Sequence, residues 1–169
     1  SAALALALCL TLLPGTALAA EADWAKDAVD KLNGIYGENL FSANDGTMTV
    51  AELNTLMEKT GWETDKVSSG DSGNLSRGTA CEVLADVFGL PVPEGKTAIQ
   101  YLYDQNIISG KANGNLAESD PVTKAQFAVL TYRVLNSVGG GMGSKDGWPE
   151  PGSKGYTAWM YLAVRKCVP

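Results

Sequence analysis

Apolar residues recur at three- and four-residue spacing through residues 23–139, which is the period of amphipathic helices. No stretch of strict alternation is long enough to predict a strand. Helices are expected at 24–33, 49–59, 96–105 and 123–138, with a further one that Ser76 opens and Gly89 closes. The residues expected to face inward are Trp24, Ala28, Val29, Leu32, Leu53, Leu56, Met57, Ala80, Val83, Leu84, Val87, Phe88, Ala98, Ile99, Leu102, Phe127, Leu130, Val134 and Leu135. The pattern therefore predicts an all-α fold.

Capping signals mark the starts of three of these helices. Residues 49–52 read Thr-Val-Ala-Glu and residues 123–126 read Thr-Lys-Ala-Gln. In such a box the Thr hydroxyl and the Glu or Gln side chain each bond a backbone N–H that the helix leaves unpaired. Ser76 is expected to cap its helix alone, and Gly34 is expected to end the first helix.

The helices follow a repeated order along the chain. Segments 24–62 and 96–139 each read as a helix, a turn of Gly-Ile or Ile-Ile type, a loop with Asp-Gly or Asn-Gly, and a capped helix. Segment 68–90 holds only the second half of this unit. We therefore expect helix-loop-helix repeats with a shortened middle copy.

The two ends of the chain differ in composition from the helical region between them. Residues 2–13 form an uncharged apolar run that stops at Pro14, and an Ala-Leu-Ala sequence follows at 17–19. This length suits a signal peptide without its positive n-region and is short of the roughly 20 apolar residues of a membrane span. The expected organisation is a signal peptide at 1–19, the helical module at 20–139, a Gly-rich linker at 140–155, and the start of a further segment or truncated domain at 156–169.

Composition excludes several functions. The 169-residue chain has a formal charge of −6 and no histidine, which excludes histidine acid-base catalysis and histidine metal ligation. Its 13 Lys and Arg are scattered, whereas a nucleic-acid phosphate backbone requires clustered positive charge. No carboxylate pair comes with a nucleophile motif. We expect no catalytic residue, no cofactor, no metal and no nucleic-acid partner.

Two smaller features are candidates for a metal site and for a disulfide. Residues 44–46, Asn-Asp-Gly, suggest a calcium loop, but counting back from Gly46 puts Phe41 and Ala43 where calcium requires oxygen ligands. After signal cleavage Cys81 and Cys167 remain, and export permits a disulfide between them. A buried Cys81 beside an unpaired Cys167 is the alternative.

Residues 98–99, 107–110, 113–114 and 122–127 together resemble a repeat of the S-layer homology family of bacterial cell-surface proteins. In that family the second helix usually opens with Thr-Arg-Ala-Glu after a Gly-rich loop and a Gly-Ile turn. Segment 24–62 resembles a second copy and 68–90 a shortened one. The resemblance implies a pseudo-threefold bundle with the capped helices at its centre.

The same resemblance implies non-covalent anchoring of an exported protein to the cell wall. In this family, grooves between repeats bind secondary cell-wall polysaccharide, an acidic glycan. A basic residue at a helix N-terminus adds its charge to free backbone N–H groups and the helix dipole, which together form an anion site. The family's Arg falls on Val50, Arg77 and Lys124, so Arg77 is intact and Lys124 keeps only the charge.

The expected ligand-binding residues are Arg77, Lys124, Ser76, Thr123 and Trp24. Trp24 could stack on a sugar ring, although a Trp that starts an amphipathic helix is more often a core anchor. Arg77 could instead be a solvated side chain in a first helical turn. The protein is expected at the cell surface, without membrane contact once the signal is removed.

Two alternative functions remain compatible with these patterns. The module could pack against other surface-layer proteins without touching sugar. It could also anchor a larger surface enzyme whose catalytic part lies beyond Pro169.

Overall fold

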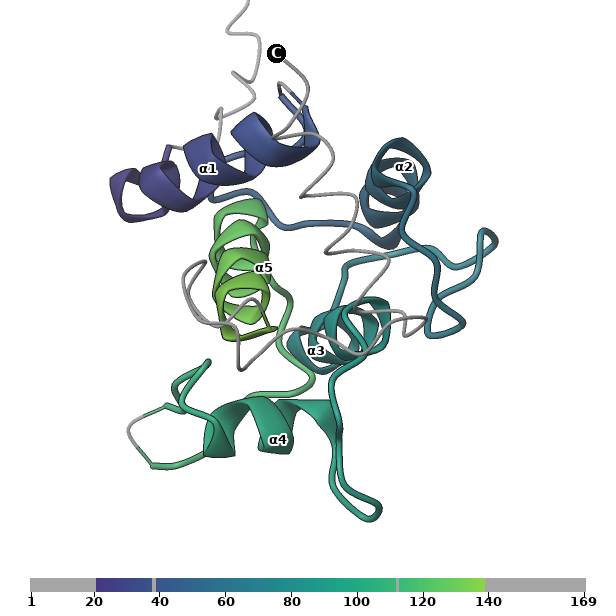
Figure 1. Cartoon of the computed structure of the whole chain (residues 1–169), viewed down its shortest axis with the longest axis vertical. Coiled ribbons are helices and arrows are strands. Elements are labelled where there is room, and N and C mark those ends of the chain that lie inside the picture. Colours follow the sequence, from purple (N-terminus) through teal and green to yellow (C-terminus); the bar gives the residue numbers. More distant parts are fainter. Residues whose placement is uncertain (1–20, 38, 112, 139–169) are drawn as a thin grey trace, which may run out of the picture.

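The structure is a computed structural model that describes residues 21–37, 39–111 and 113–138. The predicted signal peptide, the predicted linker, the segment 156–169 and Cys167 lie outside these residues. The described elements are η1 (Asp23–Ala25), α1 (Lys26–Tyr36), α2 (Val50–Thr60), α3 (Arg77–Val87), α4 (Ala98–Asp104) and α5 (Lys124–Val138) (Figure 1). Within the described ranges the only extended pairing consists of isolated bridges. The prediction of an all-α fold is confirmed.

The predicted helix caps are present. The Thr49 hydroxyl accepts a hydrogen bond from the Glu52 N–H at 3.2 Å, and the Glu52 carboxylate accepts one from the Thr49 N–H at 2.9 Å. Thr123 and Gln126 form the same reciprocal pair, and Ser76 accepts from the Thr79 N–H. A further box was not predicted: Thr97 caps α4 with Gln100, so this helix begins later than expected.

Two predictions for the first helix are wrong: where it ends, and that Trp24 lies on its buried face. Gly34 does not end the helix, because α1 continues to Tyr36, whose ring is buried in the core, and ends at Gly37 with a φ of 135°. Trp24 lies in η1 and not on the apolar face of α1, so its side chain is 59% exposed. The prediction that Trp24 anchors the core is therefore wrong.

The segments that lead into α2, α3 and α5 are joined by a closed ring of backbone hydrogen bonds. The Met48 N–H donates to the Val122 carbonyl at 2.9 Å, the Val122 N–H to Leu75 at 2.9 Å, and the Leu75 N–H to Met48 at 2.8 Å. All three side chains are buried, at 5% exposure or less. The starts of α2, α3 and α5 therefore meet at one place in the core.

The remaining helices pack against this centre in a regular way. α1 packs on α5, and α4 packs on α3, which also contacts α5 (Figure 1). The chain between α2 and α3 forms no helix. Of the three central helices, α3 and α5 thus each carry an outer helix from another part of the chain.

Aromatic side chains fill the core between α1, α2 and α3. The Trp62 ring packs edge-on against Tyr36 at 5.4 Å and Phe88 at 5.5 Å between centroids, and lies 6.1 Å from Phe41. Trp62 follows Gly61, whose φ of 73° ends α2 in the left-handed conformation that glycine favours. This turn places the indole ring among residues from three separate segments.

Cys81 is a buried free thiol on α3, as one of the two predictions for this residue stated. Burial raises its pKa to about 12. Thiols react as thiolates, so we expect iodoacetamide to alkylate Cys81 at neutral pH about a thousandfold more slowly in the folded than in the unfolded chain. Mass spectrometry of a Cys9→Ser, Cys167→Ser chain with and without guanidinium measures this. Equal rates would contradict the buried placement.

In the described part of the chain, every helix is too short or too polar to cross a membrane. The same residues contain no cluster of three or more acidic or Cys side chains that could hold a metal ion.

Candidate functional site

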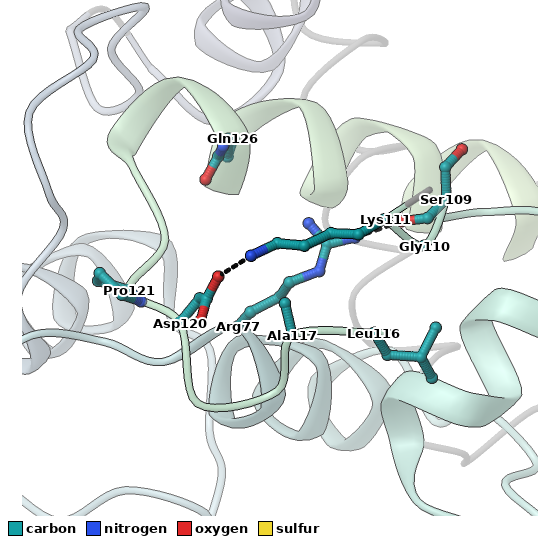
Figure 2. A pocket seen from close by; sticks show the side chains of 9 residues that line it. All are labelled: Arg77, Ser109, Gly110, Lys111, Leu116, Ala117, Asp120, Pro121 and Gln126. Carbon is teal, nitrogen blue, oxygen red and sulfur yellow. Dashed lines mark hydrogen bonds and ion pairs between the residues drawn. The ribbon is translucent and has the colours of Figure 1, made fainter. Parts of the chain in front are cut away.

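A cleft of about 220 Å³ lies beside the N-terminus of α3. One wall is the turn 109–111 that follows α4, and the other is the loop 116–121 that leads into α5 (Figure 2). The cleft is lined by Arg77, Ser109, Gly110, Lys111, Leu116, Ala117, Asp120, Pro121 and Gln126. Residues far apart in the sequence thus converge on the first residue of α3.

Arg77 forms the floor of this cleft. Its Nη2 donates to the Ser109 carbonyl at 2.8 Å, which directs the guanidinium along the wall. Its Nε is buried without a hydrogen-bond partner. In the described part of the chain no carboxylate pairs with this guanidinium, and a guanidinium has five N–H donors arranged to suit a carboxylate. Arg77 can therefore bind an anion without first losing an ion pair.

Backbone bonds hold the second wall against α3. The Arg77 N–H donates to the Asp120 carbonyl and the Gly78 N–H to the Glu118 carbonyl, both at 2.8 Å. A Cβ at position 78 would lie 3.2 Å from the Glu118 carbonyl oxygen, so glycine permits this close approach. The loop is thus fixed at a set distance from the Arg77 side chain.

These bonds overturn one part of the sequence-based expectation. The N–H groups at the start of α3 were expected to be free for an anionic ligand, but residues 77–80 all donate within the protein. At the start of α5 the N–H groups of Lys124 and Ala125 are likewise bonded, to carbonyls of Gly46 and Asn44. Anion recognition in this cleft must therefore come from side chains.

Lys111 and Asp120 face each other across the mouth of the cleft. The Lys111 Nζ lies 2.6 Å from Asp120 Oδ2, and its extended side chain passes above Arg77 (Figure 2). Both side chains are more than half exposed. Gln126, uncharged, lies on the other side of Lys111 from Arg77. With Arg77 and Lys111 against one carboxylate, the lining has a net positive charge on a protein whose total is −6.

Lys124 occupies at α5 the position that Arg77 occupies at α3, but its surroundings differ. Its Nζ forms an ion pair with Glu52 Oε1 at 2.7 Å. Burial of the Glu52 carboxyl opposes its ionisation, yet hydrogen bonds from Lys124 and Thr49 outweigh this and lower its pKa. The cation at α5 is therefore neutralised by the protein, and Val50, the third equivalent residue, is apolar and buried.

The other predicted ligand residues do not line the cleft. The Ser76 and Thr123 hydroxyls cap their helices, and Trp24 is exposed at η1. The residues that sequence reasoning missed are Ser109, Lys111 and Asp120, which come from turns. The sequence signal for the turn with Ser109 and Lys111 is the Ile-Ile-Ser-Gly motif at 107–110 followed by the Asn113-Gly114 pair, which on sequence grounds indicates only a repeat.

Residues 91–128 match the sequence model of the S-layer homology domain. This segment runs from before α4 into α5, so it contains both walls of the cleft and Gln126. The chain carries an S-layer homology domain. Searches of curated proteins and of solved structures found no match.

The S-layer homology domain is a binding module that anchors proteins to the cell wall or cell surface, and it is not catalytic. Domains of this kind commonly bind cell-wall polysaccharides. The predicted resemblance to this family and the general cell-surface location that it implies are confirmed. The matched segment overlaps the predicted repeat 96–139, while the copies at 24–62 and 68–90 stay predictions.

Proposed function

We propose that this S-layer homology module anchors an exported protein to the cell wall by binding an acidic group of secondary cell-wall polysaccharide in the Arg77 cleft. The observation that carries the proposal is an arginine at the floor of a cleft with one donor bonded to a carbonyl and no carboxylate partner in the described residues. Hydrogen bonds between charged partners contribute about 1.5 to 3 kcal/mol each, enough for one site to hold a sugar acid weakly. Firm anchoring then depends on several modules or chains acting together.

We further infer a pseudo-threefold arrangement with a shortened middle repeat. The cyclic bonds among Met48, Leu75 and Val122 support it, because each donates to the next and all three precede a capped helix. The outer helices support it as well. α1 packs on α5 and α4 packs on α3, so each outer helix covers the capped helix of the neighbouring repeat. The repeat that contains α3 has no outer helix of its own, and among the described elements no outer helix packs on α2.

Under this arrangement the equivalent positions at the starts of α3 and α5 are unequal. Arg77 and Gln126 form one pair of facing positions, and Lys124 and Glu52 form the equivalent pair. The Glu52 carboxylate already pairs with Lys124, so binding of an acidic sugar at Lys124 releases less free energy than binding at Arg77. Lys124 is therefore proposed as a secondary contact, and Ser76 and Thr123 as residues that shape the helix starts. Trp24 stays a prediction as an aromatic surface for a sugar ring.

Cosedimentation of the chain with purified cell walls tests the proposed function. We expect the chain to pellet with intact walls and to remain in the supernatant after chemical removal of the wall polysaccharide. Addition of the released polysaccharide should compete with pelleting. Equal pelleting with stripped walls would instead indicate contacts with other surface proteins or with peptidoglycan and would refute the sugar-binding proposal.

A further inference from the structure

We propose that Lys111 is a second cation for the acidic ligand and that Asp120 is its internal competitor. This inference rests on the proposed function of the Arg77 cleft and concerns the regulation of that same site. The ion pair between these two residues lies across the mouth of the cleft, above Arg77 (Figure 2). A ligand carboxylate that reaches Arg77 therefore meets the Lys111 ammonium at the entrance.

The backbones at both ends of this ion pair are fixed. The Lys111 N–H donates to the Asn115 carbonyl at 2.9 Å, and its carbonyl accepts from Gly114 at 2.8 Å. The Asp120 carbonyl accepts from the Arg77 N–H, and its own N–H donates to Ala117. Only the two side chains have to move for the pair to open, so exchange of partner requires no change in the loops.

The pair is weak enough for a ligand to displace. Its side chains are 62% and 52% exposed, and ion pairs in contact with solvent contribute only about 0.2–1 kcal/mol. A ligand carboxylate that contacts both Arg77 and Lys111 gains two charged donors and loses this one exposed pair. Asp120 then lowers the affinity for acidic ligands, and Lys111 raises it.

The test compares four variants with the parent chain in the wall-binding assay. Asp120→Asn keeps the shape of the side chain and frees Lys111, so we expect about threefold tighter binding, the gain that release of an exposed pair gives. The matched control is Asp104→Asn. It removes the same charge from the Lys96–Asp104 pair, which has the same 2.6 Å separation and similar exposure but does not line the cleft. Lys111→Met is expected to weaken binding, and the Lys111→Met, Asp120→Asn double change should lose the gain.

Titration with glucuronate, followed by NMR at the Arg77 Nε–H, separates this inference from the proposed function. The Nε–H is buried, which favours its detection, and glucose serves as the uncharged control sugar. The competitor role is supported if glucuronate shifts the Arg77 Nε–H resonance and binds Asp120→Asn about threefold more tightly than the parent chain, even if no chain pellets with walls. Wall binding that depends on Arg77 but is equal in Asp120→Asn and Asp104→Asn overturns the competitor role and leaves the proposed function standing. Tighter binding by Lys111→Met also overturns it, because the pair would then be only an obstruction.

Discussion

Replacement of Trp62 with Ala is expected to lower the free energy of unfolding by about 3–5 kcal/mol, the usual cost of removing a large buried aromatic ring. The side chain is 6% exposed and packs against Tyr36, Phe41 and Phe88. These partners belong to α1, the loop after it, and the end of α3. Loss of the ring therefore leaves a cavity where three segments meet. Denaturant unfolding followed by circular dichroism measures the effect.

Trp24→Ala is the matched control, because it makes the same chemical change at a side chain that is 59% exposed. Exposed substitutions of this kind usually change stability by no more than about 0.5 kcal/mol. Trp62→Phe should retain most of the stability, since it keeps an aromatic ring and removes an indole N–H that is buried without a partner. Equal losses in Trp62→Ala and Trp24→Ala would show that Trp62 does not organise the core.

The helices were predictable because their signals are local. Thr49 and Glu52 are three residues apart, as are Thr123 and Gln126, so a capping box is visible in the sequence and needs no tertiary contact. The apolar spacing within each helix is equally local. Trp24 and Gly34 misled the prediction because their environments depend on where the core lies. Tyr36 is buried, so the helix continues past Gly34, and η1 turns Trp24 outward.

The site could be predicted only in part, for the same physical reason. Arg77 was identified by its place at a helix start, but its bond to Ser109 joins residues 32 positions apart. The ion pair between Lys124 and Glu52 likewise joins two helices that are far apart in sequence. Nothing local reveals that Lys124 is neutralised while Arg77 shares its cleft with the uncharged Gln126. The inequality of the two positions is therefore a consequence of tertiary structure.

Arg77→Ala is expected to weaken binding to polysaccharide-bearing walls by about 10- to 100-fold, which corresponds to the loss of a charged hydrogen bond. The backbone N–H of residue 77 would still donate to the Asp120 carbonyl, so the loop that forms the second wall should keep its position. Arg77→Lys retains the charge but loses the planar pair of donors, and an intermediate affinity is expected. Cosedimentation at constant ionic strength measures both variants, and circular dichroism should show unchanged helicity.

Arg133→Ala is the control for this experiment. The substitution removes the same charge and a bond to a carbonyl two residues before Ser109, since Arg133 donates to Ile107, yet the Arg133 side chain does not line the cleft. Its wall binding should equal that of the parent chain. Lys124→Ala should have a smaller effect than Arg77→Ala, because Glu52 already neutralises Lys124. If Arg77→Ala pellets as well as Arg133→Ala, the sugar acid does not bind at the Arg77 guanidinium. If Lys124→Ala has the larger effect, the ligand displaces Glu52 and Lys124 is the stronger of the two contacts.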